Sequence, residues 1–63
     1  MSDRVDVIAV SFETGEILWL EPDRTEPNAE AIINLAIARQ GVEDRFHVAV
    51  PAGKYHKGDK YEG

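Results

Sequence analysis

Two histidines and one carboxylate in the last third of the chain are the residues nearest to a metal-binding set. His47, His56 and Asp59 carry the imidazole and carboxylate groups that zinc accepts. Their spacing matches no established zinc motif, and the 63-residue chain has no cysteine, which excludes thiolate ligands. We therefore interpret His47 as a strand residue at a sheet edge and His56 as a solvated side chain. The sequence predicts no metal and no other cofactor.

The Gly53-Lys54 pair superficially resembles part of a phosphate-binding loop. A Walker motif requires a glycine five residues before the Gly-Lys pair and a serine or threonine after it. Position 48 is Val48 and position 55 is Tyr55, so the motif is not present. The sequence therefore predicts no phosphate loop.

Two pairs of carboxylates and two serines are the remaining candidates for catalytic groups. The glutamates Glu13 and Glu16 fall in one expected turn, and the Glu43-Asp44 pair falls in another. Acid–base catalysis needs a carboxylate whose surroundings shift its pKa, and the sequence places no apolar pocket around either pair. Neither Ser2 nor Ser11 lies in a nucleophile elbow or near an expected base. We expect a protein that is not an enzyme.

Large apolar side chains offer the strongest signal for a function, which is contact with another protein. Tryptophan and phenylalanine commonly anchor interfaces, and Trp19 is the only tryptophan of the chain. The candidate contact residues for a partner or a second copy are Trp19, Phe12, Leu18 and Leu20. The alternative is that Trp19 is simply a core residue under the helix.

The C-terminal segment, residues 52–63, is a second candidate contact region. It alternates lysines with tyrosines, namely Lys54, Tyr55, Lys57, Lys60 and Tyr61. Such a segment could stack on nucleic-acid bases or bind an acidic partner, or it could be a solvated tail. The net charge of −5 counts against general affinity for nucleic acid. The charge is uneven: residues 1–44 carry three arginines and ten carboxylates, whereas residues 45–63 have a net charge of +2.

The elements that would position these residues begin with a hairpin. Residues 4–13 and 16–21 are rich in β-branched, aromatic and other large apolar side chains, and a Thr14-Gly15 step separates them. A two-residue turn would place Phe12 opposite Ile17 and Val10 opposite Trp19, and a three-residue turn is equally allowed. The two-residue register puts Phe12, Val10, Ile17 and Trp19 on one face, and Ser11, Ala9, Leu18 and Leu20 on the other. Pro22 is expected to end the second strand.

A helix over residues 26–40 and a strand over 45–51 complete the expected fold. Pro27 suits the first turn of a helix, and Gly41 suits the position after its end. Residues 52–63 are expected either to form a short hairpin around Gly58-Asp59 or to be a flexible tail. The β-β-α-β order predicts a single α+β domain over residues 1–63, with a three-stranded sheet in the order 2-1-3 and one helix on one face.

This expected fold leaves one sheet face without a cover. Both faces of the hairpin carry large apolar residues, and the chain supplies only one helix. An exposed apolar face is unusual for a stable monomer, so we expect a homodimer, formed by sheet-face packing or by edge-strand pairing. The alternative is that the C-terminal segment folds back over the open face. No apolar run approaches the roughly 18 residues of a membrane span, and no signal peptide is visible, so we expect a cytoplasmic protein with no membrane contact.

Overall fold

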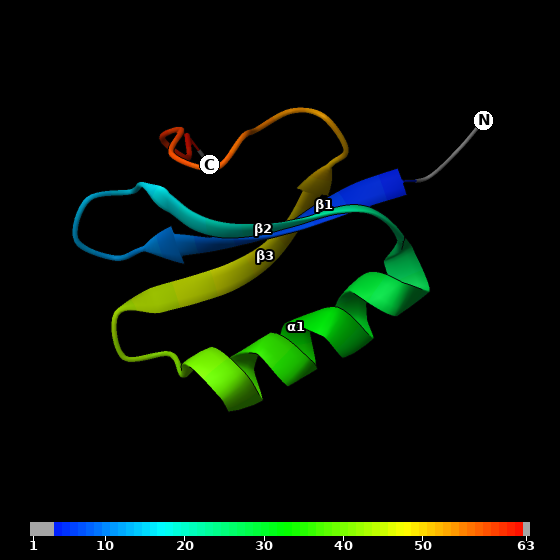
Figure 1. Ribbon diagram of the computed structural model, residues 1–63, viewed down its shortest axis with the longest axis horizontal. Helices are drawn as coiled ribbons and strands as arrows, with labels where there is room; N and C mark the ends of the chain where they lie inside the picture. Colours follow the sequence, from blue (N-terminus) through cyan, green and yellow to red (C-terminus); the bar gives the residue numbers. More distant parts are fainter. Residues whose placement is uncertain (1–3, 63) are drawn as a thin grey trace.

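The computed structural model describes residues 4–62 as three strands and one helix. The elements are β1 (Arg4–Ser11), β2 (Ile17–Thr25), α1 (Glu26–Gln40) and β3 (Arg45–Pro51). The sheet has the order β2-β1-β3, and β1 is antiparallel to both of its neighbours. The predicted α+β fold and strand order are therefore confirmed. Figure 1 shows the sheet between α1 on one side and the C-terminal segment on the other.

The helix and the last strand begin and end at the expected residues. Pro27 lies in the first turn of α1, where its missing N–H costs no hydrogen bond. Gly41 ends the helix with a φ of 79°, and its N–H donates to the carbonyl of Ile37 at 2.9 Å. A positive φ is easy for glycine and strained for other residues, so this position fixes where the chain leaves the helix. Within residues 4–62, no helix has the length and apolar character needed to cross a membrane.

The expected hairpin register is wrong. The structure pairs Val10 with Ile17 and Ala9 with Trp19, so a bulge at Leu18 separates these two pairs. The first strand ends at Ser11 rather than at residue 13, and Phe12 lies in the turn. The turn is longer than expected because Ser11 closes it, with its N–H donating to the carbonyl of Glu16 at 2.9 Å.

The second strand is longer than predicted and does not stop at Pro22. It continues to Thr25 through a second bulge, between the pairs Val7–Glu21 and Val5–Arg24. A proline is tolerated here because β2 is an edge strand and the bulge interrupts the ladder. Asp23 has a φ of 59° in this bulge, and its N–H donates to the Oδ1 atom of Asp6 at 2.8 Å.

The bulge at Leu18 also overturns the predicted distribution of side chains between the faces. Ile17 faces the same side as Val10 and Ile8, in a core cluster that also contacts Leu20. Trp19 instead lies on the helix-covered face, where it lines a groove with residues of α1. One extra residue is enough to do this, because side chains alternate between faces along a strand.

The C-terminal segment covers the second sheet face, as the alternative to an open face expected, and it forms neither the predicted short hairpin nor a free tail. Lys60 forms an isolated antiparallel β-bridge with Glu16, just before β2 begins. The N–H of Ile17 donates to the carbonyl of Asp59 at 2.8 Å, and the N–H of Tyr61 donates to that of Gly15 at 2.8 Å. Tyr55 is 7% exposed within the core cluster. The face that was expected to be open is therefore covered within one chain. An exposed sheet face is thus no longer a reason to expect a homodimer.

Candidate functional site

Trp19 lies at one end of a row of side chains that crosses the helix-covered face. Ala9 pairs with Trp19 on β2 and with His47 on β3. Because the small side chain of Ala9 is fully buried between them, the two rings approach each other above it. Their centroids are 6.3 Å apart, with an interplanar angle of 70°. This edge-to-face contact is a favourable aromatic geometry and holds the indole in place.

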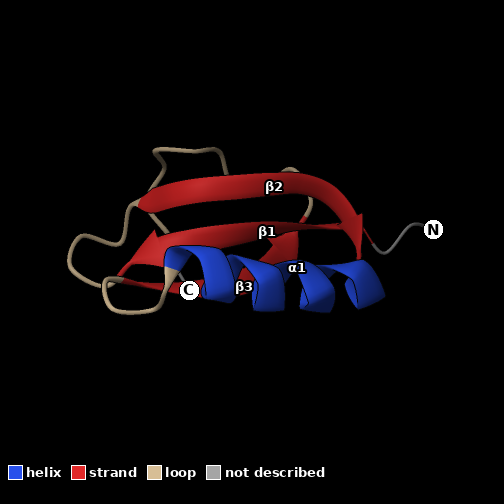
Figure 2. Cartoon of the chain, turned by 60° about the horizontal axis from the view of Figure 1, so that its bottom comes forward, coloured by secondary structure: helices blue, strands red, loops and turns tan. Residues whose placement is uncertain are grey.

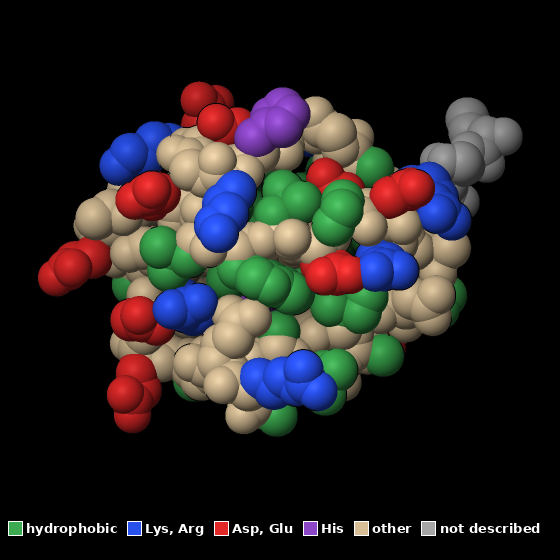
Figure 3. Space-filling view, viewed as in Figure 1, with side chains coloured by type: hydrophobic (Ala, Val, Ile, Leu, Met, Phe, Trp, Pro, Cys, Tyr) green, Lys and Arg blue, Asp and Glu red, His purple; other side chains and the backbone are tan. Residues whose placement is uncertain are grey.

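Beside Trp19 lies a groove between α1 and β2. Figure 2 shows α1 in front of β3 and next to β1, whereas β2 lies farther from the helix. The groove has a volume of about 520 Å³. Its lining residues are Trp19, Glu21, Arg24, Asn28, Ala31, Ile32, Leu35, Ala36, Arg39 and Gln40, and we call this the Trp19 groove. Leu35 is 54% exposed on its helical wall. In Figure 3, hydrophobic side chains form a band across the middle of the view, where β2 runs in Figure 1.

The charged side chains of the Trp19 groove are two arginines and one glutamate. Arg24 forms an ion pair with Glu21 three residues earlier. Arg39, in the last turn of α1, forms no ion pair with any residue between 4 and 62. The groove therefore carries a net positive charge, although the whole protein has a net charge of −5.

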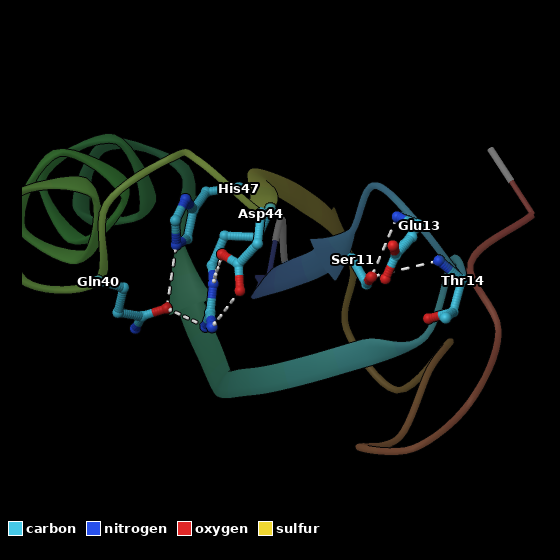
Figure 4. A network of polar contacts seen from close by, with 7 residues as sticks. Ser11, Glu13, Thr14, Gln40, Asp44 and His47 are labelled. Carbon is cyan, nitrogen blue, oxygen red and sulfur yellow. Dashed lines mark hydrogen bonds and ion pairs between the residues drawn. The ribbon is translucent and has the colours of Figure 1, made fainter.

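A polar network closes the end of α1 against the start of β3 (Figure 4). The Oε1 atom of Gln40 accepts hydrogen bonds from Arg45 at 3.0 Å and from Nε2 of His47 at 3.1 Å. A guanidinium can only donate, so the Gln40 oxygen must face it, and Nε2 of His47 must then carry the proton. Arg45 also donates to Asp44 at 3.0 Å and lowers the pKa of that carboxyl below its usual value.

Burial lowers the pKa of His47 below its ordinary value of 6.5, and the nearby charge of Arg45 lowers it further. The Nδ1 atom of His47 is buried and has no hydrogen-bond partner within the described part of the chain. A protonated ring would need a partner for that nitrogen, so the arrangement favours the neutral imidazole. His47 is therefore a packed strand residue of the helix-covered face.

The other predicted contact residues do not share a surface with Trp19. Leu20 packs against the core cluster on the opposite sheet face. Phe12 is 62% exposed in the β1–β2 turn, with its ring 5.6 Å from that of Phe46, and Leu18 lines a separate hollow beside Phe12. The Ser11 hydroxyl accepts hydrogen bonds from the N–H groups of the two residues after Phe12, at 3.1 and 3.2 Å (Figure 4). That serine therefore stabilises the turn.

The tyrosines of the C-terminal segment are part of the core rather than of a stacking platform. Tyr61 is half-buried, with its ring 5.7 Å from that of Phe46 and 5.5 Å from that of Tyr55. Lys54 lies over the ring of Tyr55, with Nζ 5.6 Å from the ring centroid. Lys60 donates to the carbonyl of Thr14 at 2.8 Å. Lys57 is exposed and borders a hollow beside Leu20.

The candidate metal ligands His56 and Asp59, and the candidate phosphate-loop residue Gly53, interact with other groups of the chain. His56 and Asp59 approach each other at 3.6 Å, but within residues 4–62 no group of three histidine or carboxylate side chains is arranged to hold a metal. The N–H of Gly53, which a phosphate loop would direct at its ligand, donates to the Oδ2 atom of Asp6 at 3.0 Å.

Asp6 is the residue that the sequence reasoning missed. It is 4% exposed in the middle of β1, and its two carboxylate oxygens accept from Asp23 in the second bulge and from Gly53 in the C-terminal segment. The available signal was a carboxylate flanked by Val5 and Val7 in an otherwise apolar strand. A buried charge there requires hydrogen-bond donors from elsewhere in the chain.

Comparison of the chain with protein-family models, with curated proteins and with solved structures found no match.

Proposed function

We propose that this chain is a non-enzymatic protein-binding module that works as a homodimer. Its binding site is the Trp19 groove. The occupant is a peptide segment of another protein that carries a large apolar side chain next to a carboxylate. The observation that carries this proposal is the half-buried Trp19 beside the exposed Leu35, in a groove that ends at Arg39, which forms no ion pair within residues 4–62.

The apolar part of the groove supports the class of partner. Its volume of about 520 Å³ falls in the size range of ligand-binding clefts. Tryptophan is among the residues that contribute most to binding energy, because a large ring loses much contact with water when it is covered. The His47 contact fixes the Trp19 ring before binding, which reduces the entropy lost on association.

The charges support the chemistry of the occupant. Arg24 is already paired with Glu21, whereas Arg39 has no carboxylate partner within residues 4–62. A carboxylate on the bound segment would give Arg39 that partner in a charge-assisted hydrogen bond. A basic segment would instead place like charges together at the end of the groove, which disfavours it.

Selection from a random peptide library tests the proposal. Because Trp19 is the only tryptophan, its fluorescence reports occupation of the groove directly. We expect the selected peptides to share an apolar residue next to an aspartate or glutamate, and to shift the Trp19 emission. Leu35→Glu should weaken their binding more than about tenfold, since it places a charge in the apolar wall and repels the peptide carboxylate.

Ile37→Glu is the matched control, because Ile37 is also exposed on α1 but does not line the groove. It should leave peptide binding unchanged. The proposed binding site is wrong if no peptide is enriched, or if the enriched peptides bind Leu35→Glu as tightly as the wild-type protein.

A further inference from the structure

The outer edge of β3 presents backbone groups that have no partner in the described chain. Phe12 donates to the carbonyl of Asp44 at 3.1 Å, and Ala52 donates to that of Arg4 at 3.2 Å. These two bonds lie at residues 44 and 52, just before and just after β3. Hydrogen bonds recur at every second residue of an antiparallel pair, so the even-numbered residues of β3 point their backbone groups at β1. The N–H and C=O groups of three residues point outward, away from β1, and nothing in residues 4–62 pairs with them: Arg45, His47 and Ala49.

The two edges of this sheet differ in how they are protected. The outer edge of β2 is paired with the C-terminal segment at Ile17, interrupted by two bulges, and deprived of a donor at Pro22. Bulges, prolines and covering segments are the features that keep edge strands from pairing with other chains. By contrast, β3 pairs with β1 without a register shift and has a proline only at its last residue, Pro51.

We propose that β3 pairs with β3 of a second copy, antiparallel across a two-fold axis at His47. This inference rests on the homodimeric state in the proposed function and names its interface. Each His47 then exchanges hydrogen bonds with His47 of the second copy, and Arg45 does so with Ala49. All three outward N–H groups and all three C=O groups are satisfied. Moving the axis to Val48 would place Pro51, which has no N–H, opposite Arg45, and one carbonyl would lose its donor.

The side chains beside this edge suit the same axis. On α1, the side chain of Ile33 lines the hollow between the helix and the end of β3. Ile37 lies one turn later on the same flank of the helix and is 39% exposed. Val42 follows the helix and is 51% exposed. A two-fold axis at His47, whose ring contacts Gln40 of α1, brings the Ile37 side chains of the two copies toward each other. On the opposite face, Phe46 comes opposite Val48 of the second copy.

The charges are also complementary in this register. A hollow of about 610 Å³ lies between the first half of α1 and the end of β3, and Glu26, Glu30 and Ala49 are among its lining residues. Its one lining arginine, Arg4, is already paired with Asp23. Arg45 of the second copy pairs opposite Ala49, so its side chain, which also bonds to Asp44 and Gln40 of its own chain, comes beside these glutamates. Opposite charges at this point favour the antiparallel self-pairing over other partners.

Amide hydrogen exchange measured by NMR, together with sedimentation equilibrium, tests the interface on the unaltered protein. At concentrations where the dimer forms, the amides of Arg45, His47 and Ala49 should exchange at least about tenfold more slowly than in dilute solution. The amides of Phe46, Val48 and Val50 already bond to β1 and should be protected at every concentration, so they serve as an internal control.

Two variants then separate the interface from the Trp19 groove. Ile37→Glu should shift the sedimentation mass from the dimer to the monomer, and Leu35→Glu should leave it unchanged. A chain that remains monomeric at high micromolar concentration overturns both the homodimer and this interface. A dimer in which the Arg45, His47 and Ala49 amides exchange as fast in concentrated as in dilute solution overturns the interface alone.

Discussion

Asp6 joins three segments of the chain through one buried carboxylate. Its oxygens accept from Asp23 at 2.8 Å and from Gly53 at 3.0 Å, so β1 is tied both to the second bulge of β2 and to the start of the C-terminal segment. The two donors are backbone N–H groups that would otherwise need partners of their own. A single side chain therefore fixes where the C-terminal segment leaves β3.

Asp6→Asn should lower the free energy of unfolding by roughly 2 kcal/mol, measured by urea denaturation. An amide has only one oxygen, so its NH₂ group must face one of the two N–H donors. Asp23→Asn is the matched control, since that side chain is 68% exposed and asparagine tolerates the positive φ at this position. We expect a much smaller effect there, and equal losses in the two variants would contradict the role assigned to Asp6.

His47 makes the stability of the fold depend on pH. Burial and Arg45 lower its pKa in the folded state, so below pH 6.5 the unfolded chain binds a proton that the folded chain does not. The free energy of unfolding should therefore fall as the pH drops from 6.5 toward the folded-state pKa, and it should be insensitive to this group above pH 7. Urea midpoints measured between pH 7 and pH 5.5 would show the slope.

His47→Gln is the comparison for the pH measurement, because glutamine keeps a polar side chain and does not titrate. The slope between pH 7 and pH 5.5 should become smaller in this variant. If the wild-type protein and the variant have the same slope, His47 is not the group responsible. The pH window stays above the range in which exposed carboxylates gain protons.

At the scale of elements, the C-terminal segment acts as the second layer of the fold. A three-stranded sheet with one helix leaves an apolar face exposed, and Tyr55 and Tyr61 cover it from a segment without regular secondary structure. The backbone bonds of this segment to Ile17 and Gly15 hold it against β2 (Figure 1). Removing its anchor should therefore affect the whole domain.

Tyr55→Ala should cost about 3–5 kcal/mol, the range for truncating a buried aromatic side chain. A domain of this size has an unfolding free energy of roughly 3–9 kcal/mol, so the variant should be largely or partly unfolded by circular dichroism. Tyr55→Phe is the control, because it removes only the hydroxyl that accepts from the N–H of Glu62 at 3.3 Å. A fold that tolerates Tyr55→Ala as well as Tyr55→Phe would show that the segment is not part of the core.

At the scale of the whole molecule, the two proposed surfaces lie on opposite edges of the sheet. The Trp19 groove borders β2, and the dimer edge is β3. A dimer through β3 would therefore leave both grooves accessible, one at each outer edge of a continuous six-stranded sheet formed by two three-stranded sheets. The variants Leu35→Glu and Ile37→Glu should therefore affect different processes. Leu35→Glu should weaken peptide binding and leave the dimer intact, whereas Ile37→Glu should weaken dimerisation and leave peptide binding intact.

Local sequence patterns were enough to predict which elements form and in what order. The mainly apolar residues 5–10, Pro27 and Gly41 are local signals, and they predicted the start of the first strand and both ends of α1 correctly, but not the end of that strand at Ser11. Trp19 stands out by its type alone, because it is the only tryptophan of the chain. The helix signals work because proline and glycine restrict or widen the backbone angles at their own positions, whatever the rest of the chain does.

The register of the hairpin, the side chains on each sheet face and the cover of the second face follow from contacts between residues far apart in the chain. The bulges at Leu18 and beside Pro22 have no distinct sequence pattern, yet the first moves Trp19 to the helix-covered face. The position of the C-terminal segment depends on contacts with residues more than 35 positions away, such as Ile17 and Asp6. Local sequence patterns do not show such distant contacts, so the sequence left the closed second face as an alternative to the homodimer and could not decide between the two.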